Sequence, residues 1–295
     1  MGIDALEVAA INVKDDFFNR YPYLDVKTDN ESIYDKEHNI FAKRIGQVLA
    51  QCTRVAESVR HVLVSGSTPI VFSGDHSSAL GTISGIKSAY PDDQIGVVWI
   101  DAHADIHSPN SSPSGNIHGM PLSAAMAIDN HQYKINDVDQ NTIDLWNNMK
   151  VIGTGETKIL PQHLIYFGVR DTEEAEDRII SELNIRNFRV EEVHYKGIRS
   201  CVSEALSRME ACKYIYISFD VDSMDADRIS DGTGTPVAKG FDPEEIASMI
   251  SLLCSSGKVV CIEVCEINPL LDTKNKMAET AFSIIRQVVP DLVGI

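Results

Sequence analysis

Six short, mostly apolar runs are spread along the chain, and longer stretches with apolar residues at helical spacing separate them. The runs cover residues 69–72, 95–100, 164–169, 187–190, 214–219 and 259–264. Apolar runs of this length without regular apolar–polar alternation are typical of strands that are buried on both faces. We therefore predict a strand in each run.

Helical spacing is clearest over residues 45–62, where Gly66 suits the end of the helix. A second well-defined start is the segment 242–245, which combines an N-cap aspartate, a first-turn proline and a glutamate at the third helical position. Further helices are predicted through residues 80–83, over 123–133 and 141–149, around 202–209, and over 277–289, where the last one closes before Pro290.

Strands that alternate with helices predict an α/β fold, in which right-handed crossovers build a parallel sheet covered on both faces. A chain of 295 residues can hold one large domain or two small ones. No Pro/Gly/Ser-rich linker divides it, so we expect a single domain over residues 1–295. Residues 1–38 have little periodicity and are predicted to be loop.

The most informative polar residues follow the run 95–100. Asp101, His103 and Asp105 are spaced by two, so in a near-extended backbone their side chains leave on one side and can converge on one point. Aspartate and histidine are common metal ligands. The alternative for this segment is a polar strand-to-loop junction in which an aspartate caps a helix.

Two other strand ends carry the same residue types. His76 follows the run 69–72, and Asp220 and Asp222 end the run 214–219. Ligands of parallel α/β sheets bind at the carboxyl ends of the strands. We therefore expect six residues to converge there: His76, Asp101, His103, Asp105, Asp220 and Asp222.

Four carboxylates and two imidazoles without a thiolate form a hard ligand set. Such a set suits Mn²⁺, with Co²⁺ or Fe²⁺ as alternatives, better than a structural zinc ion. Four carboxylates are too many for one divalent ion and fit two ions that share bridging oxygens. Two such ions would bind a water molecule, lower its pKa and deliver hydroxide to an electrophilic carbon or phosphorus.

The composition indicates which kinds of partner and which cellular compartment to expect. The formal net charge of −17 argues against nucleic acid as a partner and fits a cationic small-molecule substrate. The six cysteines form no CxxC pair, which is typical of reduced thiols in a cytosolic protein. No signal peptide or membrane-length apolar run is visible, so we expect a cytoplasmic protein without a membrane partner.

Five segments carry a resemblance to a known family. They occur in the order GDHSSALGTISG, DAHADIHSPNSSPSGNIHG, SFDVDSMD, GTGTPV and EVCEINP, and the similarity covers about residues 67–289. Together they resemble the ureohydrolase family, and arginases most of all. The resemblance implies a three-layer α/β/α fold on a doubly wound, eight-stranded, mostly parallel sheet. It also implies two Mn²⁺ ions per chain, a homo-oligomer that is a trimer or a hexamer, and hydrolysis of L-arginine to L-ornithine and urea by metal-bound hydroxide.

The resemblance assigns roles position by position. The six converging residues look like the family's metal ligands, and Asp105 would also hydrogen-bond the bridging hydroxide. His118 matches the family's histidine that passes a proton towards the leaving amine, although a loop histidine taken alone is more often a surface residue. Glu266 matches the carboxylate that faces the guanidinium. Alternatively, Glu266 could cap the final loop.

The amino-acid end of the substrate would meet five further residues by the same resemblance: His107, Ser112, Ser114, Asn116 and Glu173. Thr235 fits the family's Thr-Gly-Thr-Pro turn near the guanidinium and Glu266. His107 stands where arginases usually have asparagine, and Glu173 stands where they usually have aspartate for the α-amino group. Glu173 also lies in the acidic run 171–176, which suits a helix N-terminus. Both replacements are longer than the family's residues, so the substrate could be a relative of arginine.

The metal core alone does not select the substrate. Agmatinase, guanidinobutyrase and formiminoglutamase share it, and only the loops around the substrate tail separate these enzymes. A non-catalytic homologue that serves as a binding subunit would be expected to lack a ligand or the shuttle histidine, and none is lacking. Two departures are structural. The segment between Asp222 and Thr235 looks slightly longer than in typical arginases, and the family's opening strand and its glycine-rich turn are not recognisable before Ile40.

Overall fold

The sheet predicted from the apolar runs is present in the computed structural model, which describes residues 1–155 and 157–293. Its strands are β1 (Ile70–Phe72), β2 (Ile95–Ile100), β3 (Leu164–Phe167), β4 (Arg186–Phe188), β5 (Tyr214–Asp220) and β6 (Val259–Cys265). They lie in the order β1-β6-β5-β2-β3-β4, and every neighbouring pair is parallel. Each predicted run therefore contains a strand.

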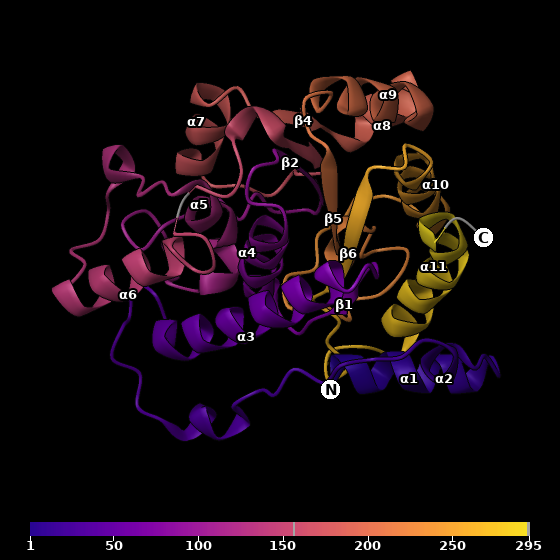
Figure 1. Cartoon of the computed structure of the whole chain (residues 1–295), viewed down its shortest axis with the longest axis horizontal. Helices are drawn as coiled ribbons and strands as arrows, with labels where there is room; N and C mark the ends of the chain where they lie inside the picture. Colours follow the sequence, from indigo (N-terminus) through magenta and orange to yellow (C-terminus); the bar gives the residue numbers. More distant parts are fainter. Residues whose placement is uncertain (156, 294–295) are drawn as a thin grey trace.

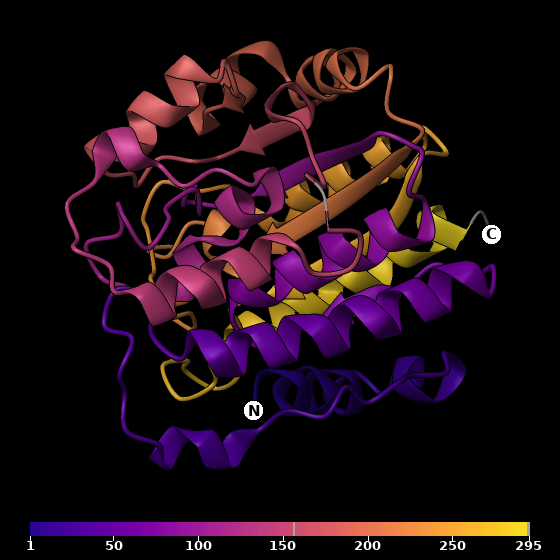
Figure 2. The same cartoon turned by 60° about the vertical axis from the view of Figure 1, so that its left-hand side comes forward.

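Helices cover both faces of this sheet (Figures 1 and 2). On one face lie α3 (Ile45–Val64), α4 (Ala79–Ala89), α5 (Pro121–Met126), α6 (Gln140–Lys150) and α7 (Glu174–Glu182). On the other lie α1 (Gly2–Asn12), α8 (Val190–Lys196), α9 (Ile198–Arg208), α10 (Pro243–Cys254) and α11 (Lys276–Val293). In β2, Val97 and Trp99 point into the first core, and Val98 and Ile100 point into the second. The α/β fold with a parallel sheet is confirmed.

The number of strands differs from the prediction. The described residues form six strands, so the eight implied by the resemblance are wrong. Residues 1–69 contain no strand. They begin instead with α1, whose Ala5, Leu6 and Ala9 are buried in the core that α11 shares. Alanine and leucine favour helix, and their spacing makes an apolar stripe along a helix rather than an alternating strand pattern.

The prediction of loop over residues 1–38 is also wrong in part. This segment contains α1, α2 (Phe17–Arg20) and a 3₁₀ helix (Asn30–Tyr34). The rings of Phe17 and Phe18 lie 6.5 and 5.8 Å from the ring of Phe72 in β1. The aromatic side chains of α2 thus pack against the edge strand of the sheet, where no further strand is present among the described residues.

Two helix boundaries differ from the prediction as well. The helix predicted over 123–133 stops at Met126, because Ala127 and Asn130 adopt left-handed backbone angles with φ of 57° and 52°. The last helix runs through Pro290 to its end at Val293. A proline in the last turn of a helix disrupts few of its hydrogen bonds.

The two adjacent central strands β2 and β5 and the edge strand β1 all end on the same side of the parallel sheet, where the predicted ligands follow them. The single domain over residues 1–295 stays a prediction, and residues 294–295 lie outside the described part. Within the described residues, no helix is both long and apolar enough to cross a lipid bilayer.

Candidate metal centre

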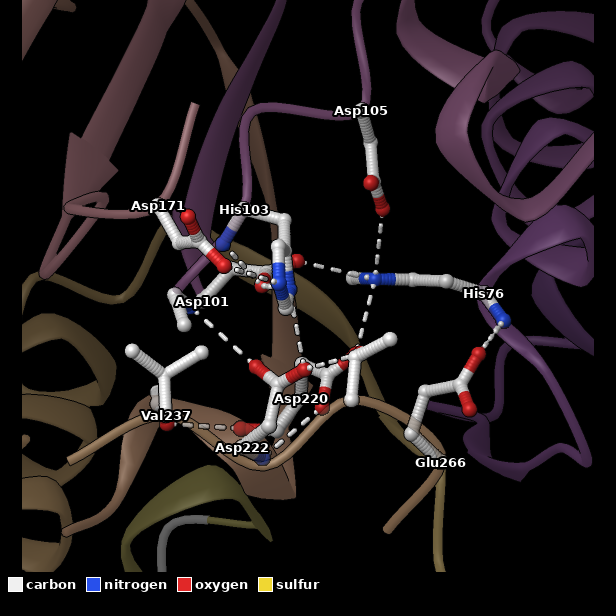
Figure 3. A network of polar contacts seen from close by, with 12 residues as sticks. His76, Asp101, His103, Asp105, Asp171, Asp220, Asp222, Val237 and Glu266 are labelled. Carbon is white, nitrogen blue, oxygen red and sulfur yellow. Dashed lines mark hydrogen bonds and ion pairs between the residues drawn. The ribbon is translucent and has the colours of Figure 1, made fainter. Parts of the chain in front are cut away.

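His76 begins a short 3₁₀ turn after β1 and faces three carboxylates (Figure 3). Its Nδ1 lies 3.0 Å from Asp101 Oδ2, 3.0 Å from Asp105 Oδ2 and 3.1 Å from Asp220 Oδ2. Asp101 directly follows β2, and Asp220 is the last residue of β5. Side chains from three strand ends therefore converge on one point, as the sequence predicts.

A second group forms around His103. The His103 Nδ1 atom lies 3.0 Å from Asp222 Oδ2 and 3.6 Å from Asp101 Oδ1. Asp101 thus belongs to both groups, with one oxygen towards each histidine (Figure 3). The structure brings all six predicted ligands together, and a carboxylate between two ligand groups is compatible with a pair of divalent ions.

The crowding of buried carboxylates is electrostatically unfavourable. Burial and the charge of Asp101 raise the pKa of Asp105 and raise that of Asp222 to about 6. Burial and the charges of Asp222 and Asp101 raise the pKa of Asp220 well above its usual range. Although burial also opposes the ionised form of Asp101, the nearby imidazoles of His103 and His76 lower its pKa overall. Bound cations would remove this repulsion between carboxylates.

Two of the buried atoms indicate a cation more directly. His76 Nδ1 and Asp101 Oδ2 are inaccessible to solvent and have no hydrogen-bond partner in the described residues, although they lie 3.0 Å apart. Buried polar atoms are normally hydrogen-bonded. Lone pairs that converge without a hydrogen bond fit metal ligands, so the residues present fit the implied metal.

One thiol also lies beside this group. Cys265 ends β6, and its Sγ lies 3.6 Å from Asp220 Oδ2. Burial raises the pKa of Cys265 well above its usual range. Burial therefore disfavours the thiolate, and the thiol contacts the ligand group as a hydrogen-bond donor to Asp220.

A set of buried side chains orients the His76 ring from behind. His76 Nε2 lies 2.7 Å from Ser218 Oγ, and the Tyr216 hydroxyl lies 3.1 Å from Ser218 Oγ and 2.8 Å from Glu263 Oε2. Trp99 stacks on the imidazole with ring centroids 3.9 Å apart and an interplanar angle of 8°. Such supporting contacts hold a ligand histidine in one orientation.

Arg170 supports the loop that carries Asp222. Its half-buried guanidinium donates hydrogen bonds to the carbonyl oxygens of Asp222 at 3.1 Å and Val237 at 2.9 Å. It also donates to Ser223, Met224 and Ala238 carbonyls. Because these contacts join the segments 222–224 and 237–238, they hold Asp222 in place.

His118 and Glu266 form an ion pair next to His76. His118 Nδ1 lies 3.4 Å from Glu266 Oε1, which also accepts a hydrogen bond from the His76 backbone N–H at 2.8 Å. The hydrogen bond with Glu266 raises the pKa of His118 to about 9. Glu266 and Asp105 both have positive φ angles, 64° and 50°. Strained backbone at non-glycine residues often occurs at functional sites.

Two of the residues expected at the substrate tail are paired with each other. His107 Nε2 lies 3.0 Å from Glu173 Oε2, and His107 Nδ1 lies 3.1 Å from Ser111 Oγ. The hydrogen bond with His107 lowers the pKa of Glu173 to about 2. Glu173 is also the N-cap of α7 and forms a capping box with Glu176. The helix-start interpretation of the acidic run is therefore confirmed, and substrate binding by Glu173 stays a prediction.

The remaining predicted substrate-binding residues lie in two places. Ser112 Oγ accepts a hydrogen bond from the Gly115 N–H at 2.9 Å, and Ser114 Oγ accepts one from the Asn116 N–H at 3.1 Å. We call residues 112–116 the serine loop. Thr235 does not belong to this loop, and its hydroxyl donates a hydrogen bond to Asp222 Oδ2 at 3.2 Å. Thr235 therefore contacts a predicted metal ligand.

Comparisons with known proteins identify the family of this chain. The family model described as Arginase family matches residues 1–289. The chain belongs to the arginase family. An arginase from Bacillus subtilis is 31% identical over 265 residues, which are 90% of this chain and 82% of that protein. The arginase family is a family of metal-dependent hydrolases, so the ureohydrolase resemblance is confirmed.

Solved arginases share the fold of this arginase-family chain. The crystal structure of arginase from Bacillus subtilis matches with a TM-score of 0.80 and 29% identity, over 100% of this chain and 92% of that one. The arginase of Entamoeba histolytica, solved in complex with L-ornithine, matches with a TM-score of 0.71 and 27% identity, over 93% and 82% of the two chains.

Several residues of this arginase-family site were not predicted from the sequence. Tyr216 and Ser218 carried a signal, because they precede Asp220 at intervals of two and so share its face of β5. Asp171, whose Oδ2 lies 3.6 Å from His103 Nε2, was hidden in the acidic run. Arg170 had no local signal, since its partners are backbone atoms far along the chain.

Proposed function

We propose that this chain is an arginase-type amidinohydrolase that cleaves the guanidino group of L-arginine to give L-ornithine and urea. The observation that carries this proposal is the pair of ligand groups around His76 and His103 with Asp101 between them. Membership of the arginase family supports the reaction class. All six ligands and His118 are present, which disfavours a non-catalytic homologue.

We infer that the resident metal is a pair of Mn²⁺ ions, with Co²⁺ or Fe²⁺ as alternatives. The group around His76 would hold one ion and the group around His103 the other, with Asp101 between them. When bound, the ions would lower the pKa of a water molecule so that it can attack the guanidino carbon. The oxygen and nitrogen ligands and the unpartnered His76 Nδ1 support this inference.

The side chains around the cluster would bind the substrate and move a proton. Glu266 would accept hydrogen bonds from the planar guanidinium, and Asp105 would accept one from the attacking water. Water adds to the guanidino carbon and loses one proton to solvent. Its second proton passes to the amine nitrogen as the bond from the carbon to this nitrogen breaks. His118, which is protonated at neutral pH because its pKa is raised to about 9, would donate a proton to the leaving amine. The products are urea and a protonated amine.

The substrate tail would be selected by groups away from the metals. Ser112, Ser114 and Asn116 would hold the α-carboxylate, and Glu173, paired with His107, would attract the α-ammonium group. We place Thr235 beside the guanidino group, where it would orient Asp222. A decarboxylated tail would leave the serine loop without a partner, which is costly for binding.

Urea release from a panel of guanidino compounds tests this function. With the Mn²⁺-loaded protein, we expect kcat/KM for L-arginine to exceed that for agmatine by about 10⁴-fold, as in other sites built to hydrogen-bond a substrate group. If agmatine or guanidinobutyrate is the better substrate, the assignment of arginine is wrong. If no guanidino compound is cleaved with Mn²⁺, Co²⁺ or Fe²⁺, the non-catalytic homologue is favoured.

We further propose a cytoplasmic homo-oligomer. The six cysteines are all free and buried, which supports a reducing compartment. The trimer or hexamer rests on the family resemblance. Light scattering of the purified protein measures the mass of the assembly directly.

A further inference from the structure

One lysine stands beside the loop that is expected to hold the substrate's carboxylate. Lys43 Nζ donates a hydrogen bond to Asn116 Oδ1 at 3.2 Å. In the part of the chain that the structure describes, no ion pair involves Lys43. Its charge is therefore not neutralised by a neighbouring carboxylate and is available to an anionic group of a ligand.

The backbone around Lys43 is held against the same loop. The Lys43 N–H donates to the Gly115 carbonyl at 2.7 Å. Gly115 has a φ of 72°, and a Cβ at this position would collide with the carbonyl oxygen of Ile40. Only glycine allows two backbone segments to cross so closely here. Although the Lys43 side chain is exposed, its starting point is therefore anchored at the serine loop.

The neighbouring cation, Arg44, forms hydrogen bonds with the segment that precedes α3. Its guanidinium donates to the carbonyl oxygens of Ser32 and Ile33, the latter at 3.1 Å, and its backbone N–H donates to Glu37 Oε2 at 2.9 Å. These contacts hold the 3₁₀ helix 30–34 to the start of α3. Of the two consecutive cations, only Lys43 contacts the loop.

The rest of the site is strongly acidic. The carboxylates of the cluster and its neighbours belong to Asp101, Asp105, Asp171, Glu173, Asp220, Asp222 and Glu266. Such a field attracts the cationic groups of a guanidino substrate and repels a carboxylate on its tail. A cation at the serine loop offsets that repulsion. Because Lys43 occupies Asn116 Oδ1, it also leaves the Asn116 amide N–H groups free to donate to a ligand.

We propose that Lys43 is a specificity-determining residue that binds the tail carboxylate of the substrate together with Ser114 and Asn116. Lys43 would favour guanidino compounds that carry a carboxylate over decarboxylated ones such as agmatine. Lysine presents three donors on a flexible stem, which suits a carboxylate above an exposed loop. The assignment rests on the proposed hydrolase function and deepens it.

Lys43→Met tests this role, because methionine keeps an unbranched stem and removes the charge. In the Mn²⁺-loaded protein, kcat/KM for L-arginine should fall about tenfold, mainly through KM, whereas that for agmatine should change by less than about twofold. This size lies between those of an exposed ion pair and a charge-assisted hydrogen bond. Lys43→Arg should recover part of the loss. Lys36→Met, at an exposed lysine of the same N-terminal segment, is the matched control.

The outcomes separate this proposal from the hydrolase function. An equal fall in kcat/KM for L-arginine and agmatine would mean that Lys43 only supports the loop. Unchanged kcat/KM values for both substrates would mean that Lys43 does not bind the tail carboxylate. Either result overturns the proposal. Calorimetric binding of L-ornithine and putrescine, which differ by the carboxylate, tests the same role without turnover. If the wild type cleaves neither substrate, the proposed function fails, but weaker ornithine binding by Lys43→Met still supports this role. Unchanged ornithine binding overturns it.

Discussion

The metal-ligand cluster differs in its access to water from Glu173 and Ser114, two of the residues expected at the substrate tail. In the cluster, the side chains of His76 and Asp101 are only 2% and 1% exposed. In the tail region, the Glu173 side chain is 57% exposed, and Ser114 lies at the surface. A buried charge needs an oppositely charged partner or a metal, whereas an exposed polar group can always be solvated.

This difference explains why the roles of the cluster residues are easier to predict from the sequence than the roles of the tail residues. At the cluster, few residue types other than aspartate and histidine satisfy both burial and metal binding. In the tail region, His107 and Glu173 replace the family's usual residues and still find each other as partners at 3.0 Å. The reaction class therefore follows from the buried ligands, and the choice of substrate depends on groups that tolerate replacement.

Removing a buried ligand should lower metal content and activity more than any other change, because the cluster cannot replace a missing ligand with water from the surface. We expect Asp101→Ala or Asp222→Ala to lose at least one metal ion per chain and nearly all activity, because the remaining ligands cannot complete both groups. Elemental analysis and urea release measure the two effects. Asp137→Ala, at a fully exposed carboxylate, is the control. Full metal content in both ligand variants would show that these residues are not ligands.

His118 contacts Glu266 rather than a predicted metal ligand. We expect His118→Asn to keep both metal ions and to bind substrate, while kcat falls by about 10²- to 10⁴-fold, the usual range for general acid–base catalysis. Steady-state kinetics and metal analysis measure these quantities. His131→Asn, at a histidine whose side chain is 74% exposed, serves as the control. An unchanged kcat would return His118 to the status of a surface histidine.

A substitution in the exposed tail region should change the selectivity between L-arginine and agmatine and leave the metal content unchanged. Ser114→Ala should lower kcat/KM for L-arginine by about tenfold, the size of one hydrogen bond to a charged group. The value for agmatine should fall much less, so the ratio of the two narrows. Metal content should equal that of the wild type. Loss of metal from Ser114→Ala, or an equal fall in kcat/KM for both substrates, would show that Ser114 does not select the substrate tail.

The smallest expected effect concerns the stability of the metal-free protein. The hydrogen bond with Glu266 raises the pKa of His118 to about 9, from an ordinary value of 6.5. The protonated form is thus favoured in the folded state, so the stabilisation is complete below pH 6.5 and is lost as the pH rises through about 9. We expect His118→Asn to cost about 0.5–1 kcal/mol at pH 6 and close to nothing at pH 10. Urea denaturation at both pH values measures this, and an equal cost at both would rule out the ion pair as its source.

Much of the fold and of the metal centre could be predicted because the signals are local. A buried strand such as 95–100 is a continuous apolar run, and the spacing of Asp101, His103 and Asp105 follows from the extended backbone. Residues 1–38 were harder, because α1 is apolar on one face and also exposes Ile3 and Ile11, which blurs its helical pattern. The implied eight strands failed because this segment became helical.

Local sequence patterns were enough to predict the α/β class, the strand ends that carry the candidate ligands, and the family of the chain. Only the tertiary structure decided that Asp101 lies between two histidines, that Arg170 holds the loop of Asp222, and that Lys43 reaches Asn116 across 73 residues. Periodicity and spacing act within one element, where the backbone geometry is known in advance. Contacts between distant segments depend on how whole elements pack, and an exposed lysine or a carbonyl partner leaves no mark in the local pattern.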